Sequence, residues 1–377
     1  MSFKSASRWA LLGLWLFLAP AFSSGQAPRW WKGNLHTHSF WSDGDDFPEL
    51  IATWYKTNGY HFLALSDHNV LLAGEKWITV TNLSRHQALA RYVAALGKNW
   101  VSQRPSAHGL QVRLKTLDEF RPLLEEKQRF LLVPSEEISA AHQKLPIHLN
   151  ASNIRELIKP PEGTNVYDVI QKTVDAVLAQ RQRTGQPILA HINHPNFGWA
   201  LTAEDIMRVR GEHFFEVYNG HPSVQNEGDV DRVSVERMWD LMLAFRLSRL
   251  GLGPMFALAV DDSHNYHEAS TNKSNPGRGW IMVQAPDLTP PSLIAALEKG
   301  DFYASSGVVL RSVERSARGL RVEIEGEPGV SYVTTFFGTL RGFDPTRKPG
   351  RTPEKGNPIV TGQYSEEIGA VLGAPRD

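Results

Sequence analysis

The fold assignment depends on the stretch from Asn34 to Gly44, which reads Asn-Leu-His-Thr-His-Ser-Phe-Trp-Ser-Asp-Gly. Side chains alternate between the two faces of a β-strand, so His36 and His38 share a face and can point their imidazoles at one spot. Asp43 follows in a short serine-containing turn, where a carboxylate oxygen can fold back toward the same place. The stretch therefore predicts part of a metal site at the end of a strand.

Six further short apolar runs end in polar residues in the same manner. Together with the first, the predicted strands are residues 31–39, 61–69, 130–139, 146–152, 187–195, 213–220 and 255–264. In each run the polar side chains come last, as expected of barrel strands whose carboxyl ends carry an active site. Helical patterns over residues 47–58, 166–181 and 234–249 lie between runs. Strands that alternate with such helices predict βα units in a mainly parallel sheet, and hence an α/β barrel.

Histidines are concentrated at these predicted strand ends. Seven of the 14 histidines in the chain lie there, namely His36, His38, His68, His148, His191, His194 and His264. Histidines placed only for packing would not gather in this way, so the set is predicted to line one site. The other seven, His221 among them, are expected to be ordinary surface or capping residues. Glu216, Tyr218 and Asn219 end the sixth strand and either line the pocket or shape the barrel rim.

Carboxylates accompany the histidines at two of the strand ends. Asp262 precedes His264 by two residues and shares its face if the strand continues, so the pair can supply an oxygen and a nitrogen ligand. Glu136 and Glu137 end another strand, and because neighbours on a strand face opposite sides, one of the two can bridge metal ions. A bridging anion matters because two cations a few ångströms apart repel each other.

The composition narrows the classes of partner. The 377-residue chain has 40 basic and 40 acidic residues, so its formal net charge of zero provides no overall attraction for nucleic acid or an anionic membrane. It has no cysteine, which excludes thiolate metal sites and leaves His, Asp, Glu and carbonyl ligands. Such ligands favour zinc, manganese or iron. We expect a small-molecule substrate, and the oligomeric state stays open.

The N-terminus has the layout of a secretory signal peptide. Lys4 and Arg8 precede an unbroken apolar run from Trp9 to Ala19, which is short for a membrane span. Residues 1–25 are therefore expected to be removed, and the protein to be exported to the periplasm or the cell exterior. An uncleaved N-terminal anchor is the alternative.

The barrel is expected in residues 26–307. Two segments do not fit its alternation of strands and helices. Residues 70–129 form an insertion that is either a lid that selects substrate or a surface decoration. Residues 308–377 are expected to form a small β-rich region with a loop-rich tail. Its predicted strands at residues 320–325 and 331–337 would be joined across Gly326 to Gly329.

Taken together, the motifs resemble the PHP (polymerase and histidinol phosphatase) domain. They are His36-Thr37-His38 with Asp43-Gly44, Ser66-Asp67-His68, Pro134-Ser135-Glu136-Glu137-Ile138-Ser139, the His-Pro-Asn of the fifth strand, and Asp262-Ser263-His264. They occur in matching order from Gly33 to about His264. The resemblance implies a distorted (β/α)7 barrel that holds two or three divalent metal ions, which agrees with the seven strand ends.

The ligands that the resemblance implies fall into three sets. These are His36, His38 and Asp262 for one metal ion, His148 and the fifth-strand histidine for a second with Glu137 as the bridge, and Asp43, His68 and His264 for a third. The family pattern of His before Pro favours His194 over His191 on the fifth strand. Glu136 stands beside Glu137, so these two could exchange roles.

The implied function is hydrolysis by a metal-activated water. Metal ions lower the pKa of water and bind phosphoryl oxygens, so no side-chain nucleophile is required. His264 or Asp262 could shuttle the proton, and Lys273 or Arg278 could neutralise a phosphate oxygen. A phosphomonoester or phosphodiester is the expected substrate. The same metal centre can polarise a carbonyl, so hydrolysis of a carboxylester, carbamate or amide is the alternative, and a non-catalytic binding module is a further one.

Overall fold

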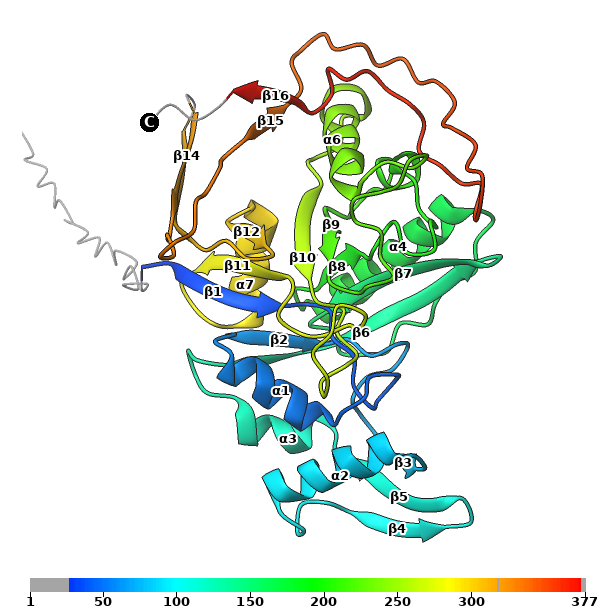
Figure 1. The fold of residues 1–377 in the computed structure, drawn as a ribbon, viewed down its shortest axis with the longest axis vertical. Coiled ribbons are helices and arrows are strands. Elements are labelled where there is room, and N and C mark those ends of the chain that lie inside the picture. The colour runs from blue at the N-terminus through cyan, green and yellow to red at the C-terminus, as the bar shows by residue number, and fades with distance from the viewer. Residues whose placement is uncertain (1–26, 317–318, 374–377) are drawn as a thin grey trace, which may run out of the picture.

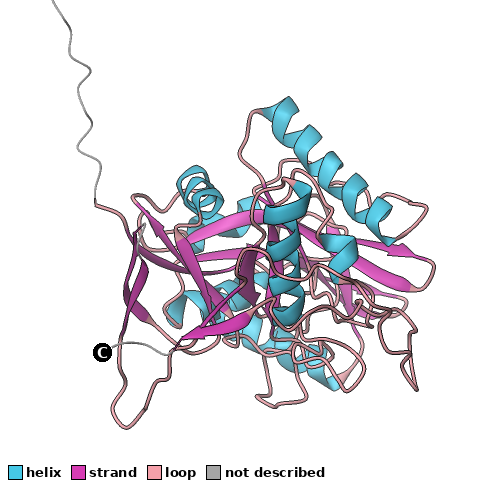
Figure 2. Ribbon diagram, turned by 90° about the horizontal axis from the view of Figure 1, so that it is seen from above, coloured by secondary structure: helices cyan, strands magenta, loops and turns pink. Residues whose placement is uncertain are grey.

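A single curved sheet forms the centre of the molecule and carries helices on its outer surface (Figure 1, Figure 2). The computed structural model describes residues 27–316 and 319–373, so the predicted signal peptide lies outside the described residues. The sheet has nine strands, in the spatial order β10 (Phe256–Val260), β9 (Phe214–Asn219), β8 (Leu189–Ile192), β7 (Leu145–Ser152), β6 (Leu131–His142), β2 (Phe62–Leu65), β1 (Arg29–Asn34), β11 (Trp280–Ala285) and β12 (Phe302–Ser305).

Seven of these strands form the barrel, in the chain order β1, β2, β6, β7, β8, β9 and β10. The two ends of the series meet where Thr37, just beyond β1, pairs in parallel with Ser263, just beyond β10. The amide of His38 donates to the Ser263 carbonyl at 2.9 Å, and the amide of Asp262 donates to the His36 carbonyl at 3.0 Å. The predicted α/β barrel is therefore confirmed, and it closes at the residues that carry the metal motifs.

The sheet is mixed, which corrects the prediction of a mainly parallel one. β7 runs antiparallel to both β6 and β8, with Ser139 of β6 opposite His148 of β7. His148 therefore belongs to the first half of its strand and not to the carboxyl end. The reason is the two-residue connection from His142 to Leu145, because a parallel neighbour would need a crossover of about a dozen residues or more. β11 and β12 extend the sheet antiparallel at the β1 edge.

Local sequence signals explain where the helices begin and end. The barrel helices are α1 (Pro48–Thr57), α4 (Val166–Thr184), α5 (Ala203–Ile206), α6 (Val235–Phe245) and α7 (Pro290–Lys299), and α6 continues into a π-helical turn, Arg246–Leu250. The Asn165 side chain accepts the Asp168 amide at the start of α4, and Gly185 ends it with a φ of 65°. A side-chain cap such as that of Asn165 stabilises a helix by about 1 kcal/mol. Among the described residues, none of the helices combines the length and the apolar character that a membrane span requires.

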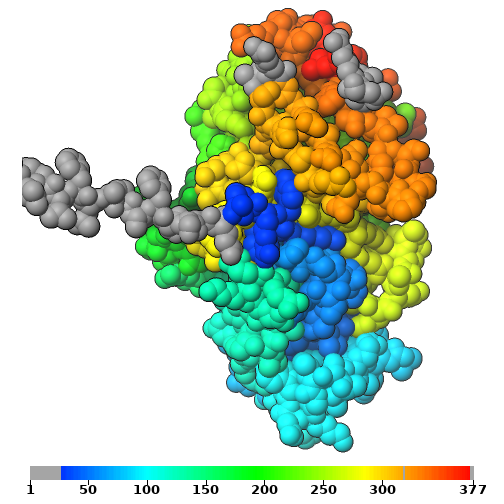
Figure 3. Space-filling model, turned by 90° about the vertical axis from the view of Figure 1, so that its left-hand side faces the viewer, coloured from blue at the N-terminus to red at the C-terminus, as the bar shows by residue number. Residues whose placement is uncertain are grey.

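Residues 70–129 form an insertion that comprises β3 (Lys76–Val80), α2 (Leu83–Leu96), β4 (Gln103–Ser106), β5 (Gly109–Leu114) and α3 (Leu117–Leu124). Its β3, α2, β4 and β5 lie at one end of the molecule, while its α3 lies beside α1 (Figure 1, Figure 3). The Tyr92 ring stacks on Phe47 with centroids 3.9 Å apart, and Lys76 Nζ donates to the Trp41 carbonyl. The insertion thus supports the loop that follows the His-Thr-His motif, and its side chains do not line the cavity described below.

The chain beyond β12 forms two small two-stranded sheets at the other end of the molecule (Figure 1). β13 (Leu310–Ser316) pairs with β14 (Gly319–Ile324), and β15 (Phe336–Gly338) pairs with β16 (Ala370–Gly373). The predicted hairpin across Gly326 to Gly329 is therefore wrong, because each of its strands has another partner. Between β15 and β16 the chain runs along the barrel, where Phe343 and Ile368 are buried.

Glu212 gives the barrel a pH-dependent contribution to stability. Its carboxyl is buried just before β9, where Oε1 accepts the amides of His213 at 2.7 Å and Phe214 at 2.8 Å. Burial raises the pKa of Glu212 to about 8, against about 4.3 in an unfolded chain. Between these values the folded state holds a proton that the unfolded state has lost. The free energy of unfolding therefore falls as the pH rises through this window, by at most about 1.4 kcal/mol per pH unit.

Glu212→Gln is expected to remove this contribution, because glutamine keeps an oxygen for both amides and does not ionise. Urea unfolding at pH 6 and pH 9 should show a smaller loss of unfolding free energy in the variant than in the parent. Glu366→Gln is the matched control, since Glu366 is exposed. Equal pH slopes in all three proteins would contradict the raised pKa of Glu212.

Candidate metal centre

Nine of the ten predicted metal ligands meet in one polar cluster at the edge of the barrel where the segments after β1 and β10 pair. They are His36, His38, Asp43, His68, Glu137, His148, His194, Asp262 and His264. They come from β6 and β7 and from the segments that follow β1, β2, β8 and β10. The cluster is thus assembled from strands across the whole barrel, and its geometry depends on barrel closure.

Glu137 lies at the centre of the cluster, with histidine nitrogens around both carboxylate oxygens. These are His68 Nδ1 at 2.8 Å, His38 Nε2 at 3.3 Å and His36 Nε2 at 3.5 Å from Oε2, and His148 Nδ1 at 2.9 Å and His194 Nε2 at 3.3 Å from Oε1. Asn193 Nδ2 donates to Oε1 at 2.8 Å and orients the carboxylate. A carboxylate with a different set of histidines on each oxygen can bridge two cations.

Asp262 places a second carboxylate beside the first two histidines. Its Oδ1 lies 3.2 Å from His36 Nε2 and 3.1 Å from His38 Nε2, while Asn219 Nδ2 donates to Oδ2 at 3.1 Å. The backbone φ is 49° at Asp262 and 20° at His194, in a region that residues other than glycine rarely adopt. Such conformations persist only where surrounding contacts hold them, and they are concentrated at functional sites.

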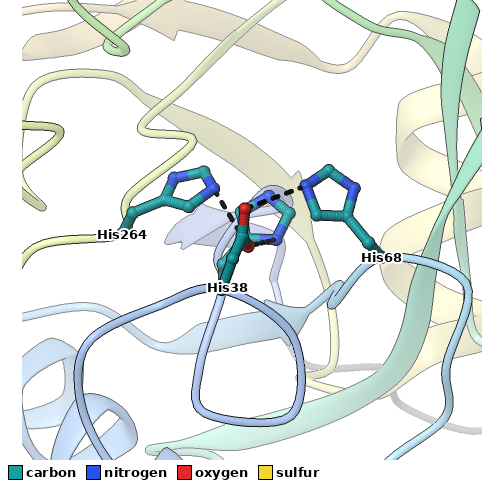
Figure 4. Close-up of side chains that lie close together, drawn as sticks. His38, His68 and His264 are labelled. Atoms are coloured by element: carbon teal, nitrogen blue, oxygen red, sulfur yellow. Dashed lines mark ion pairs between the residues drawn. The ribbon is translucent and has the colours of Figure 1, made fainter.

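Asp43 forms a third group near the surface. Figure 4 shows His38, His68 and His264 turned toward one another, with dashed lines for ion pairs. Asp43 Oδ1 is 3.4 Å from His264 Nε2 and 3.7 Å from His38 Nδ1, and Oδ2 is 3.6 Å from His68 Nε2. The Asp43 side chain is 57% exposed, so this group opens to solvent. Gly44 permits the turn, because a Cβ there would lie 2.5 Å from the His38 carbonyl oxygen.

Hydrogen bonds at the far ring nitrogens set the tautomers of two of these histidines. His36 Nδ1 lies 2.6 Å from Glu216 Oε1, and His264 Nδ1 lies 2.9 Å from the Asp262 carbonyl oxygen. Carboxylate and carbonyl oxygens only accept, so each Nδ1 carries a proton and, in the neutral ring, Nε2 presents a lone pair to the cluster. A carboxylate behind a histidine is the usual arrangement that orients a metal ligand.

Four buried atoms of the cluster have no hydrogen-bond partner among the described residues. They are His36 Nε2, His38 Nε2, His148 Nδ1 and Glu137 Oε2. A buried polar atom left unpaired costs about 1–3 kcal/mol. Cations between the four would satisfy them all, and a donor set of nitrogen and oxygen suits zinc, manganese or iron. The residues therefore fit divalent metal ions, and their atoms fall into groups within 4.8 Å that overlap at His36, His38, His68 and Glu137.

The charges of the cluster also favour cations. Burial opposes ionisation of Glu137, but the surrounding histidines hold the pKa of that carboxyl well below its usual range. Burial and the neighbouring His264 lower the pKa of His38 to about 3, so its imidazole stays neutral. His36 differs, because Asp262, Glu216 and Glu137 outweigh its burial and raise its pKa well above the usual value. A bound cation would displace that proton, so metal binding is expected to release protons and to weaken at low pH.

The structure places the members of the two residue pairs that the sequence left open in different surroundings. Glu136 points away from the cluster, where its Oε1 accepts the Ile158 amide at 2.8 Å, so Glu137 is the carboxylate among the histidines. On the fifth strand His194 faces Glu137, whereas His191 Nε2 lies 3.1 Å from Glu216 Oε1. His191 therefore supports Glu216 and does not stand among the atoms around Glu137.

The structure does not bring Lys273 and Arg278 to the cluster, contrary to their predicted role. The Arg278 guanidinium donates to the carbonyls of Gly220 at 2.7 Å and Ser270 at 2.6 Å, and thereby ties together the loops after β9 and β10. Lys273 is exposed on the second of these loops. Neither side chain lines the cavity over the cluster. The guanidinium is held by backbone carbonyls, a role that the sequence around it does not reveal.

Two residues of the site were missed or left undecided by the sequence. Glu216 accepts hydrogen bonds from four donors, which are His36 Nδ1, His191 Nε2, the His194 amide and Asn219 Nδ2. His221 lines the cavity over the cluster, together with Phe197 and the ligands, although it was predicted to be an ordinary surface residue. The available signal was its position two residues beyond the end of β9, at the barrel edge where the other motifs lie.

Comparisons with known proteins find similarity only among solved structures. No family model and no curated protein matches the sequence. A two-domain protein from Bacteroides vulgatus that contains a predicted PHP-like metal-dependent phosphoesterase matches with a TM-score of 0.38 and 16% identity, over 79% of this chain and 76% of that one. PsfC from Pseudomonas syringae matches with a TM-score of 0.35 and 13% identity, over 71% and 88%.

An amidohydrolase from Chromobacterium violaceum, solved with bound sulfate and no metal, matches with a TM-score of 0.30 and 15% identity, over 62% of this chain and 88% of that one. Proteins described as PHP-like and as amidohydrolases are thus both among the solved structures to which this chain is similar. The assignment of chemistry to this chain rests on the geometry of its own cluster.

Proposed function

We propose that this protein is a metal-dependent hydrolase of the PHP type that cleaves phosphate esters with water. The observation that carries the proposal is the set of four buried, unpaired ligand atoms around Glu137. Divalent cations bound there would lower the pKa of a water molecule and neutralise the anionic oxygens of a substrate. The residues that line the cavity include no serine, threonine or cysteine, so a side-chain nucleophile of those types is not at hand.

The chain's own residues hold this site in a fixed geometry. Glu216 orients His36, Asn193 orients Glu137, and Asn219 orients Asp262. His264 keeps its proton on Nδ1 against the Asp262 carbonyl, so its Nε2 can act as a ligand or accept a proton from water. Groups held in this way need little reorganisation during the reaction, which is the main source of electrostatic catalysis.

The size of the cavity favours a substrate with a terminal phosphate group. The cavity over the cluster has a volume of about 130 Å³, well below the usual range of about 300–1,000 Å³ for pockets that enclose a whole ligand. It can therefore hold the reacting group, while the remainder of the substrate lies outside. A phosphomonoester meets this condition more simply than a phosphodiester, whose phosphorus carries two substituents.

A carbonyl substrate is the second candidate, and a specific observation favours it. No lysine or arginine lines the cavity, although a phosphate dianion is commonly met by such a side chain. Phe197 instead lies against His194, with ring centroids 5.0 Å apart, and gives the mouth an apolar wall. A carboxylester, carbamate or amide would suit that wall, and the same cations would polarise its carbonyl oxygen.

The two candidates are separated by assays on the purified protein loaded with zinc or with manganese. We expect turnover of p-nitrophenyl phosphate that exceeds turnover of bis-p-nitrophenyl phosphate and of a naphthyl ester. Turnover of the ester alone would replace the phosphoesterase proposal with the second candidate. His36→Ala should abolish any true activity, while His86→Ala, at an exposed position in the insertion, should keep it. Activity that survives in His36→Ala would indicate a contaminant.

A further inference from the structure

His221 lines the cavity without belonging to any of the ligand groups found in the described residues. It is half-buried on the loop after β9. Its ring lies 5.4 Å from the His264 ring and 6.0 Å from the Phe197 ring, centroid to centroid, and stands nearly perpendicular to both. His221 therefore lies beside the residues that line the cavity, and its ring makes no ion pair or hydrogen bond with a carboxylate of the described residues.

The tautomer of His221 is set by the backbone. The amide of Ser223 donates to His221 Nδ1 at 3.1 Å. An amide nitrogen can only donate, so Nδ1 must be the unprotonated nitrogen and the neutral ring carries its proton on Nε2. Nε2 makes no hydrogen bond to any described residue. The one polar group that His221 has to offer at the cavity is therefore an N–H donor.

The loop that carries this donor is tied to the ligand strands. The His221 amide donates to Asn219 Oδ1 at 2.8 Å, and the same Asn219 side chain donates to Asp262 and to Glu216. The amide of Val224 closes the turn by donating to the His221 carbonyl at 3.0 Å. Gly220 fits closely, because a Cβ there would lie 2.8 Å from the Asp261 carbonyl oxygen. The donor is thus held in place before substrate arrives.

We propose that His221 is a further catalytic residue, which donates its Nε2–H to the substrate oxygen that gains negative charge during hydrolysis. This proposal rests on the hydrolase function proposed above and applies to a phosphoryl or a carbonyl oxygen alike. No bond is made or broken at His221. It transfers no proton, because a neutral imidazole would first have to be protonated at Nδ1, and that lone pair accepts the Ser223 amide. The neutral His221 ring thus presents the positive end of an N–H dipole to a cavity whose lining contains no lysine or arginine.

The matched variants are His221→Phe, which keeps the ring contacts and removes the donor, and His221→Gln, whose Nε2 can replace it. Loss of one preorganised donor of this kind lowers kcat by about 10²- to 10³-fold. We expect such a loss in His221→Phe on whichever probe the parent turns over, with metal content and melting temperature little changed. His221→Gln should recover most of kcat. Parental kcat in His221→Phe, or loss of metal from both variants, would overturn the proposal.

A readout that does not need turnover separates this proposal from the proposed function. The ¹⁵N spectrum of histidine-labelled, metal-loaded protein should lose one neutral Nε2–H imidazole signal in His221→Phe, while the signal of His61, whose Nδ1 likewise accepts a backbone amide, remains. Binding of inorganic phosphate by calorimetry should be weaker in His221→Phe than in the parent and restored in His221→Gln. If no probe is hydrolysed but these two results hold, the hydrolase function fails and the donor role stands. A protonated Nδ1 at His221, or phosphate binding unaffected by His221→Phe, would refute the donor role itself.

Discussion

Glu137→Gln is expected to abolish hydrolysis and to remove most of the bound metal. The two oxygens of Glu137 face five histidine nitrogens, and Oε2 has no hydrogen-bond partner of its own. A neutral amide cannot offset the repulsion between two neighbouring cations, and its NH₂ group would face lone pairs that are meant for metal. We expect a loss of activity of about 10³-fold or more, which corresponds to about 4 kcal/mol of transition-state stabilisation.

The neighbouring residue provides the control. Glu136 lies on the same strand but faces the other way, and burial raises its pKa to about 8. Its carboxyl is thus largely protonated at neutral pH, so glutamine is a close substitute. Metal analysis of the purified proteins should find at least about two equivalents in the parent and in Glu136→Gln, and fewer in Glu137→Gln. The opposite pattern would exchange the roles of the two glutamates, and full metal content in both variants would refute the bridging site.

Much of this cluster could be predicted from local sequence because strand ends converge in a barrel whatever the details of its topology. His36 and His38 are two apart on one strand, and Asp262 and His264 are two apart after another. Alternation along each segment places such pairs on a common side. Barrel closure then brings the pairs together, as the Thr37–Ser263 pairing shows. These residues required no knowledge of distant contacts.

The direction of β7 was predicted wrongly because the boundary of β6 was misplaced. The sequence places a strand end at Ser139, which leaves six residues before Pro146, and a gap of that length does not identify a hairpin. The strand in fact continues through Ala140 to His142, so only two residues connect it to β7. The pairing of β15 with β16 was missed for a different reason. Their paired residues lie more than 30 positions apart, from Gly338–Ala370 to Phe336–Gly373, and no local pattern encodes such a contact.

The roles of Glu216 and His221 in the site could not be predicted from the sequence. A glutamate on a barrel strand can either shape the barrel rim or line the pocket. The role of Glu216 depends on its hydrogen bonds with His36 and His191, which are distant in sequence. The role of His221 depends on a hydrogen bond from the Ser223 backbone, which follows from the turn conformation and not from residue type. Supporting contacts of this kind become visible only in three dimensions.

Glu216→Gln tests the most important of these supporting contacts. Both carboxylate oxygens accept from two donors each, so a glutamine must direct its NH₂ group at donors in either orientation. If NH₂ faces His36 Nδ1, that nitrogen must give up its proton, and the proton moves to Nε2, the atom that would bind metal. If NH₂ faces the other side, it opposes the His194 amide and Asn219 Nδ2. Either arrangement weakens the site without removing any proposed ligand.

Substitution of residues behind metal-binding histidines typically costs about 10- to 100-fold in metal affinity. We therefore expect Glu216→Gln to release metal to a competing chelator at a concentration lower by about that factor, with a parallel loss of activity that excess metal restores in part. Glu212→Gln is the matched control, because Glu212 is also a buried glutamate beside β9 but contacts no residue of the cluster. Affinity equal to that of the parent in Glu216→Gln would show that His36 does not depend on Glu216. An equal loss in both variants would show that β9 as a whole, and not this one carboxylate, supports the metal site.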